Sequence, residues 1–256
     1  MQIEIIIIGL LLVLSAAAIH GALGVGFPML ATPVLALVYD LKVAITFTIV
    51  PSFLAILFSL YQCRNYSVDL KEHYLLIAVV SLGSLSGAWL LTWANASVLK
   101  LLLAGAILLY LLSGFLRKYL CLLSSRPVAF PVLMGASAGL IGGATNAIAP
   151  LLMIYLLERV RSTKEIILVA NICFLIGELM QLAVFSLFFT FEDLQLVPLS
   201  MITLVTYIGL LAGFKFQSTI DEYWYRSIIR YALSIFMCIL TYQGVISLFF
   251  SGASVA

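Results

Sequence analysis

The stretch GLIGGATNAIAP, at residues 139–150, interrupts a long apolar segment with glycines, a threonine, an asparagine and a proline. The stretch GALGVGFPMLATP, at residues 21–33, interrupts another long apolar segment in the same way. Each interruption opens one half of the chain and is followed by further apolar segments of ordinary length. We interpret this pattern as an internal duplication in which each half begins with a helix that is broken in the middle.

The composition around these two breaks is that of an integral membrane protein. Hydrophobic residues make up 64% of the 256-residue chain, the mean hydropathy is +1.21, and only 13 Lys or Arg and 11 Asp or Glu are present. So few charges could not cover the core of a water-soluble fold. The apolar runs suit helices that cross roughly 30 Å of hydrocarbon, and not the short alternating strands of a barrel. The sequence therefore predicts an all-α polytopic membrane protein.

The apolar segments define two repeats, at residues 1–116 and 127–256, joined by a linker at residues 117–126. The segments lie at residues 3–39, 43–62, 74–94, 98–116, 127–157, 166–190, 196–214 and 227–250. Small residues four positions apart predict close contacts between membrane helices. Such pairs are Gly83/Gly87, Gly135/Gly139 and Gly209/Gly213.

Each broken segment is expected to form a hairpin that enters and leaves the membrane on the same face. With hairpins, Lys42 and Lys100 lie on one side of the membrane and the other 11 of the 13 Lys and Arg lie on the opposite side. Because Lys and Arg accumulate on the cytoplasmic side, we expect the linker and residues 158–165 to be cytoplasmic and the N-terminus to be outside. One hairpin plus three transmembrane helices per repeat inverts the second repeat relative to the first, as in many secondary transporters.

The two breaks also indicate where a ligand would bind. Irregular backbone inside a bilayer survives only where it is packed in protein or lines a cavity. The return limbs, residues 28–38 and 146–157, would begin at mid-depth and direct two helix N-termini to one place. Each N-terminus carries roughly half a positive charge and free N–H groups. The sequence therefore predicts an anion site near the midplane, formed by dipoles and neutral donors.

Small and polar residues near the breaks are the candidates for substrate binding. Glycine lets the backbone bend and lets an anion approach it closely, and Thr145 or Asn146 could cap a helix or donate to the anion. Alternatively, the glycines serve only helix packing, and the hydroxyls bond their own helix backbone. The candidates are Gly24, Gly26, Phe27, Pro28, Thr48, Ser52, Gly142, Gly143, Thr145, Asn146 and Asn171.

Two ionisable residues inside the predicted spans are candidates for proton coupling. Asn171, Glu178 and Gln181 are spaced to share one helical face, and an acid inside a membrane is by default a functional hypothesis. Glu178 would have to be neutral while an anion is bound, because its charge would repel the anion. The alternative is a neutral Glu178 in a helix interface. His20, at the first break, is either a proton relay or a polar cap.

The runs GALGVGFPMLATPVLAL, at residues 21–37, and GLIGGATNAIAPLLMIYLL, at residues 139–157, resemble the sulfite exporter TauE/SafE family, also called the toluenesulfonate uptake family. The resemblance covers essentially the whole chain. It implies secondary transport of sulfite, sulfoacetate or other organosulfonates across the inner membrane. The residues that match the family motif are Gly21, Gly24, Gly26, Pro28, Gly139, Gly142, Gly143, Asn146 and Pro150.

Other functions find less support in the sequence. Cys63, Cys121, Cys173 and Cys238 lack the spacing of a zinc site or a disulfide framework, so we expect no metal and no cofactor. The net charge of +2 gives no reason to expect a nucleic acid partner. The acids in the loops form no catalytic set, which disfavours a membrane-embedded enzyme. A passive anion channel with the same helix-terminus site is the main alternative. The expected partners are a small anion, the lipid bilayer and a coupling proton, and a second copy of the chain is a further candidate.

Overall fold

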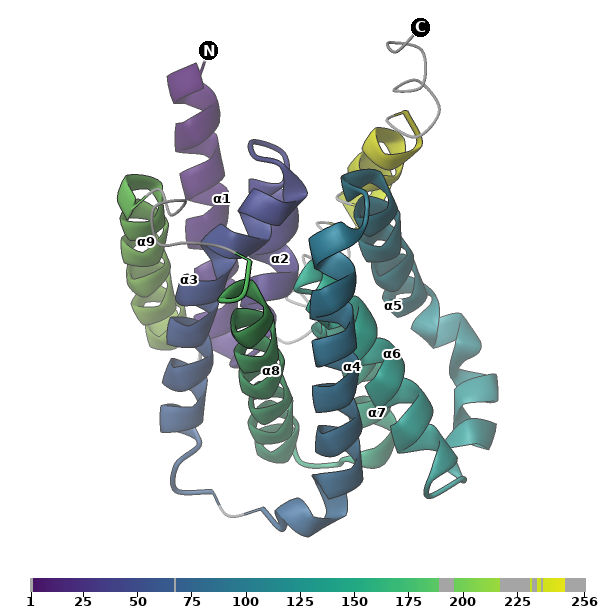
Figure 1. Cartoon of the computed structure of the whole chain (residues 1–256). Coiled ribbons are helices and arrows are strands. Elements are labelled where there is room, and N and C mark those ends of the chain that lie inside the picture. Colours follow the sequence, from purple (N-terminus) through teal and green to yellow (C-terminus); the bar gives the residue numbers. More distant parts are fainter. Residues whose placement is uncertain are drawn as a thin grey trace, which may run out of the picture.

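The computed structural model describes residues 2–66, 68–188, 196–216, 231, 234–235 and 237–246, and this part of the chain consists of helices and short connections without strands (Figure 1). The helices are α1 (Gln2–Leu23), α2 (Phe27–Leu35), α3 (Leu41–Gln62), η1 (Leu70–His73), α4 (Tyr74–Trp93), α5 (Ala96–Ser124), α6 (Ala129–Thr145), α7 (Ala149–Arg159), α8 (Thr163–Phe185) and α9 (Leu196–Phe216).

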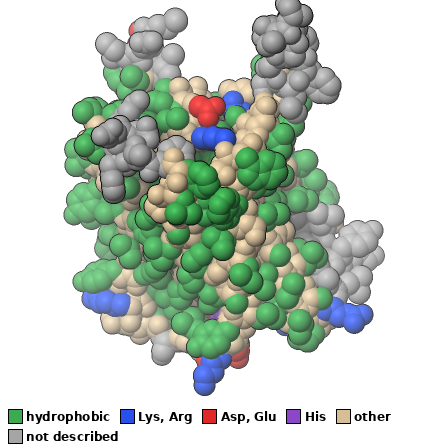
Figure 2. All heavy atoms as spheres, in the orientation of Figure 1, with side chains coloured by type: hydrophobic (Ala, Val, Ile, Leu, Met, Phe, Trp, Pro, Cys, Tyr) green, Lys and Arg blue, Asp and Glu red, His purple; other side chains and the backbone are tan. Residues whose placement is uncertain are grey.

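Five helices in the described residues are long and apolar enough to cross a membrane. They are Ile6–Leu23 within α1, Leu41–Gln62, Leu70–Trp93, Thr163–Phe185 and Leu196–Lys215 within α9. On the face seen in Figure 2, hydrophobic side chains fill the middle, and the charged side chains lie near the two ends. The prediction of an all-α, multi-pass membrane protein is therefore confirmed.

Both predicted breaks are present as short interruptions between two helices. The first lies between α1 and α2, and the second between α6 and α7. In Figure 1, α1 starts at the top of the view and α2 returns toward the top, where α3 begins. The pair α6 and α7 does the reverse, because α6 starts at the bottom and the chain returns to the bottom before α8. Two antiparallel helix pairs therefore enter the bundle from opposite ends.

Two helix boundaries have local causes, and one of them differs from the expected division of the chain. α3 begins after Asp40, whose carboxylate accepts a hydrogen bond from the Lys42 N–H (3.0 Å) and so caps the helix. α5 continues to Ser124, through most of the segment expected to link the repeats, and ends before Pro127, which disfavours a helical residue ahead of it. Most of the predicted segment 227–250 lies outside the described residues, and its residues 237–246 are helical.

Glycines bring two pairs of helices into backbone contact. A Cβ atom on Gly83 of α4 would lie 2.8 Å from the Ala136 carbonyl oxygen of α6. Likewise, a Cβ atom on Gly209 of α9 would lie 2.6 Å from the Leu14 carbonyl oxygen of α1. Both distances are too short for a real side chain, so only glycine permits this packing. The close contacts predicted from the spaced glycine pairs are confirmed here.

Candidate functional site

The first break is built from two glycines and a buried histidine. Gly24 and Gly26 have φ angles of 79° and 106°, in the left-handed region that glycine adopts without strain. Nδ1 of His20 accepts a hydrogen bond from the Phe27 N–H (3.0 Å), which places the ring proton on Nε2. Nε2 lies 3.1 Å from the Ala55 carbonyl oxygen and 2.9 Å from the Ser59 hydroxyl, both on α3. His20 therefore caps the N-terminus of α2 and ties it to α3.

The second break depends on Asn146. This residue ends α6 with a left-handed φ of 60°, and its N–H donates to the Gly142 carbonyl (2.6 Å). Its side-chain amide donates to the hydroxyls of Thr48 on α3 (2.9 Å) and Thr32 on α2 (3.4 Å). The Thr48 hydroxyl in turn lies 2.8 Å from the Ile45 carbonyl of its own helix. Asn146 therefore anchors the second break to the first half of the chain.

The expectation that Thr145 or Asn146 caps the following helix is wrong. α7 begins only at Ala149, and its N-cap residue, Ile148, makes no side-chain capping bond in the described structure. The Thr145 hydroxyl donates to the Ile141 carbonyl of its own helix (2.7 Å). Asn146 belongs to the end of α6, and its left-handed backbone directs the amide toward α2 and α3. Among the described residues, no side chain caps the N-terminus of α7.

The two breaks are braced reciprocally across the halves. Just as Asn146 of the second half contacts the hydroxyls of the first half, Asn171 of α8 donates its amide to the Gly24 carbonyl at the first break (2.6 Å). Both asparagines are buried, at 5% and 0% exposure. Buried amides need partners, because an unpaired polar group in an apolar interior costs about 1–3 kcal/mol. Each break therefore depends on a side chain from the other half.

A small cavity lies between the breaks, where the first turns of α2 and α7 converge. It is partly open, and in this conformation the space between its walls is close to that of a single water molecule. The lining contains the starts of two helices, the second break and one face of α8, and none of it is Lys or Arg. The lining residues are Pro28, Met29, Asn146, Ile148, Ala149, Phe174 and Glu178. The cavity therefore receives two electropositive helix ends.

Glu178 is the one ionisable side chain in this lining. It is 2% exposed, and neither carboxyl oxygen has a hydrogen-bond partner among the described residues. The hydroxyl of Ser52 on α3 lies beside this carboxyl, but it too is buried without a partner that meets hydrogen-bond geometry. Burying an ionised carboxylate in this way would carry a large free-energy cost, so this conformation suits the neutral acid.

The predicted polar face of α8 is buried along its length. Asn171, Glu178 and Gln181 are 0%, 2% and 1% exposed, as expected for residues that share one side of the helix. The Gln181 amide donates to the Gly143 carbonyl of α6 (2.8 Å). The face therefore supports both breaks at its two ends and presents an acid to the cavity between them.

The glycines of the two breaks differ in their surroundings. No described atom lies within 4 Å of a Cβ atom placed on Gly26, whereas a Cβ atom on Gly24 would lie 2.8 Å from Ile167 Cγ2. Gly143 packs against the backbone of α4, where a Cβ atom would lie 2.9 Å from the Ala88 nitrogen, and Gly142 packs against Ile148. The helix-packing alternative thus describes Gly142 and Gly143 well, and neither lines the cavity.

Several residues at the centre were not singled out from the sequence. Met29, Ile148 and Ala149 line the cavity because they flank the helix starts, and Phe174 lines it from α8. A signal existed for Phe174, since it lies three residues after Asn171 and four before Glu178, on the same helical face. Thr32, which contacts Asn146, gave no comparable signal.

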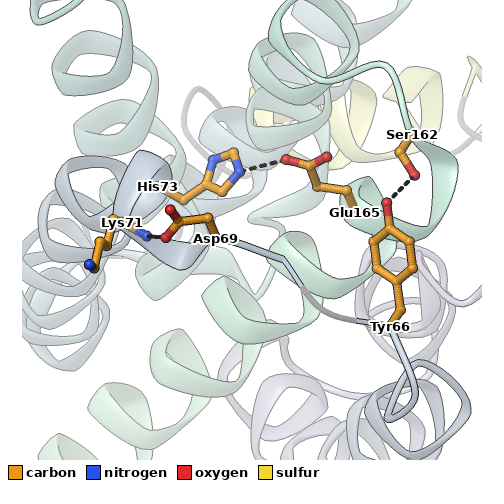
Figure 3. A network of polar contacts seen from close by, with 6 residues as sticks. All are labelled: Tyr66, Asp69, Lys71, His73, Ser162 and Glu165. Atoms are coloured by element: carbon orange, nitrogen blue, oxygen red, sulfur yellow. Dashed lines mark hydrogen bonds and ion pairs between the residues drawn. The ribbon is translucent and has the colours of Figure 1, made fainter.

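A second polar network joins the two halves at the end of the bundle drawn at the bottom of Figure 1 (Figure 3). The His73 Nε2 atom lies 3.0 Å from Glu165 Oε1, and the Tyr66 hydroxyl lies 2.9 Å from that of Ser162. His73 ends η1, and Glu165 lies in the first turn of α8. The network therefore fastens the connection between α3 and α4 to the start of α8.

Several helices are long and apolar enough to cross a membrane, and two broken segments meet at a buried polar centre. These features define a multi-pass membrane protein. The model of the sulfite exporter TauE/SafE family matches residues 8–243, nearly the whole chain. The protein therefore belongs to this family of membrane transporters. No curated protein and no solved structure gives a significant match.

Proposed function

We propose that the protein is a secondary transporter that carries sulfite, sulfoacetate or other organosulfonates across the inner membrane. The observation that carries the proposal is the cavity shared by the first turns of α2 and α7. We place the anion in this cavity, at the midplane. Family membership supports the class of substrate. In these first turns, Pro28 and Pro150 have no N–H, and the remaining N–H groups lack intrahelical partners.

The binding site that we propose has two backbone donors, the N–H groups of Met29 and Ala149 at the two helix starts. Asn146 lines the site, and its side-chain amide fixes the hydroxyls of Thr48 and Thr32 beside it. Gly26 provides open space beside the first helix start, where a Cβ atom would meet no described atom within 4 Å. Three polar side chains lie behind these donors and support the residues that carry them. They are those of Thr48, Ser52 and Asn171. Such a site holds an anion without a fixed cation, which favours release as well as binding.

The fold supports a transport cycle based on two inverted repeats. The antiparallel pairs α1–α2 and α6–α7 enter from opposite ends, as expected if residues 1–116 and 127–256 are related by inversion (Figure 1). Transporters of this architecture rock one repeat against the other around a fixed midplane site. In our proposal the connection after α5 and residues 158–165 face the cytoplasm, and the N-terminus faces outward.

We assign proton coupling to Glu178 and a positioning role to His20. Glu178 reaches the cavity with an unpaired carboxyl, so it can take up a proton before the anion binds and release it after the anion has left. Both ring nitrogens of His20 already have partners at the first break. His20 therefore holds the backbone that forms the site.

Counterflow in proteoliposomes tests the proposed function. Proteoliposomes that contain the protein and are loaded with unlabelled sulfite should take up labelled sulfite, and sulfoacetate should compete with this uptake. A passive channel would instead give a current across a planar bilayer without saturation. If none of these anions is carried or competes, the assignment of the substrate is wrong.

Replacing Glu178 by Gln tests the coupling. Gln keeps the size and a donor but cannot titrate, so uptake by the variant should continue but should no longer accelerate under an inward proton gradient. Uptake with and without the gradient measures this, and Ser52→Ala is the matched control beside the same carboxyl. An unchanged response to the gradient would remove Glu178 from the mechanism.

A further inference from the structure

We infer that the cavity selects its cargo by charge state, accepting monoanions such as hydrogen sulfite and R–SO₃⁻ and rejecting the dianions sulfite (SO₃²⁻) and sulfate. This inference rests on the proposed function and specifies which form of the sulfur anion the same site binds. Charge balance, the unpaired acid and the apolar part of the wall each support it.

The positive charge available at the cavity matches one negative charge. The two helix ends contribute about half a charge each, or about one in total. The lining adds no Lys or Arg, and the nearby His20 holds its single ring proton on the side away from the Phe27 N–H. A second negative charge would therefore stay uncompensated in an apolar environment, which is strongly unfavourable.

The unpaired carboxyl of Glu178 points to the same selection. An ionised Glu178 beside a bound anion would repel it, so the filled site requires the neutral acid. The neutral carboxyl has one O–H, and no described residue accepts from it. An oxygen atom of the anion can accept this hydrogen bond, which gives the buried acid a partner that no described residue provides. A dianion would favour transfer of this proton and would leave two like charges in place.

The rest of the wall is apolar and suits an organic substituent. Met29, Ile148 and Phe174 contribute side chains that offer dispersion contacts and no hydrogen bonds. Hydrogen sulfite has three oxygens on sulfur, one of them protonated, and a sulfonate has three oxygens and in addition a carbon, which can face this apolar side while the oxygens face the donors. The site therefore accepts a small alkyl group on sulfur, but it has nothing to balance a further charge.

The test uses competition at several pH values in proteoliposomes that contain the full chain. Labelled sulfite is the substrate, methanesulfonate is the competitor that stays a monoanion, and sulfate is the competitor that stays a dianion. We expect sulfate to inhibit about tenfold more weakly than methanesulfonate, a factor that corresponds to about 1.4 kcal/mol, or not at all. In Glu178→Gln, where the acid cannot titrate, methanesulfonate should inhibit equally at every pH. The KM for total sulfite should rise with pH as the hydrogen sulfite fraction falls.

The outcomes separate this inference from the proposed function. If labelled sulfite is carried but sulfate competes as well as methanesulfonate, selection by charge state is wrong and the transport assignment stands. If the rise of KM with pH disappears in Glu178→Gln, the titrating group belongs to the protein, which also overturns the inference. If no sulfur anion is carried at any pH, the proposed function itself fails.

Discussion

The two breaks reach the same cavity with different local chemistry. At the first, His20 accepts from the Phe27 N–H, so a side chain already uses the leading donor of α2. At the second, α7 starts without a side-chain cap, and its leading donor stays free for a ligand. The first break bends through two glycines, whereas the second bends through Asn146, which also lines the cavity. We call the first break the braced break, because a side chain already binds its leading donor. We call the second break the available break, because its leading donor is free to bind a ligand.

The largest effect is expected from Gly143→Val, just before the second break. The new side chain would collide with the backbone of α4, where a Cβ atom already lies 2.9 Å from the Ala88 nitrogen. We expect loss of folded protein, measured as the monodisperse fraction in detergent. Gly105→Val is the matched control, because no described atom lies within 4 Å of a Cβ atom at Gly105. Normal folding of the Gly143 variant would show that α4 and α6 can separate without penalty.

The next effect concerns the available break. Asn146→Gly keeps the left-handed backbone but deletes the amide that contacts Thr48 and Thr32. We expect the KM for sulfite to rise about tenfold and stability to fall by about 1–3 kcal/mol, because buried hydroxyls lose a partner. Counterflow kinetics and thermal unfolding in detergent measure the two quantities. A lower stability with an unchanged KM would make Asn146 a brace like His20.

The braced break should respond mainly in stability. His20→Leu leaves the buried Phe27 N–H without its acceptor, so we expect a loss of about 1–3 kcal/mol in stability. The KM for sulfite, which does not depend on the amount of folded protein, should change less than in Asn146→Gly. Ser59→Ala is the control, since the Ala55 carbonyl remains a partner for Nε2. A larger KM effect than that of Asn146→Gly would reverse the comparison.

The smallest effect is expected far from both breaks. Glu165→Ala removes the contact with His73 at the end of the bundle. The Glu165 side chain is 25% exposed, so water can replace it beside His73, and a hydrogen bond of this kind contributes a net of about 0.5–1.5 kcal/mol. We expect a change in stability within that range and an unchanged KM for sulfite, measured by the same two assays. A KM effect here would show that this network takes part in the transport cycle.

Local signals in the sequence predicted the breaks but could not predict what holds them. Gly and Pro inside an apolar run interrupt a helix whatever the tertiary context, so both interruptions could be located. The contact between Asn146 and Thr48 joins residues 98 positions apart, and that between Asn171 and Gly24 joins residues 147 apart. No local pattern specifies such pairs. The start of α7 was also displaced, because Asn146 ends one helix instead of beginning the next.

The reciprocal asparagine braces have a consequence for biosynthesis. A nascent chain that stops before residue 171 lacks the amide that satisfies the Gly24 carbonyl, and this group then lies unpaired in an apolar interior. The first hairpin can therefore enter the membrane early but cannot reach its final shape until α8 has been made. Maturation of the N-terminal half therefore waits until the ribosome has made α8 in the C-terminal half.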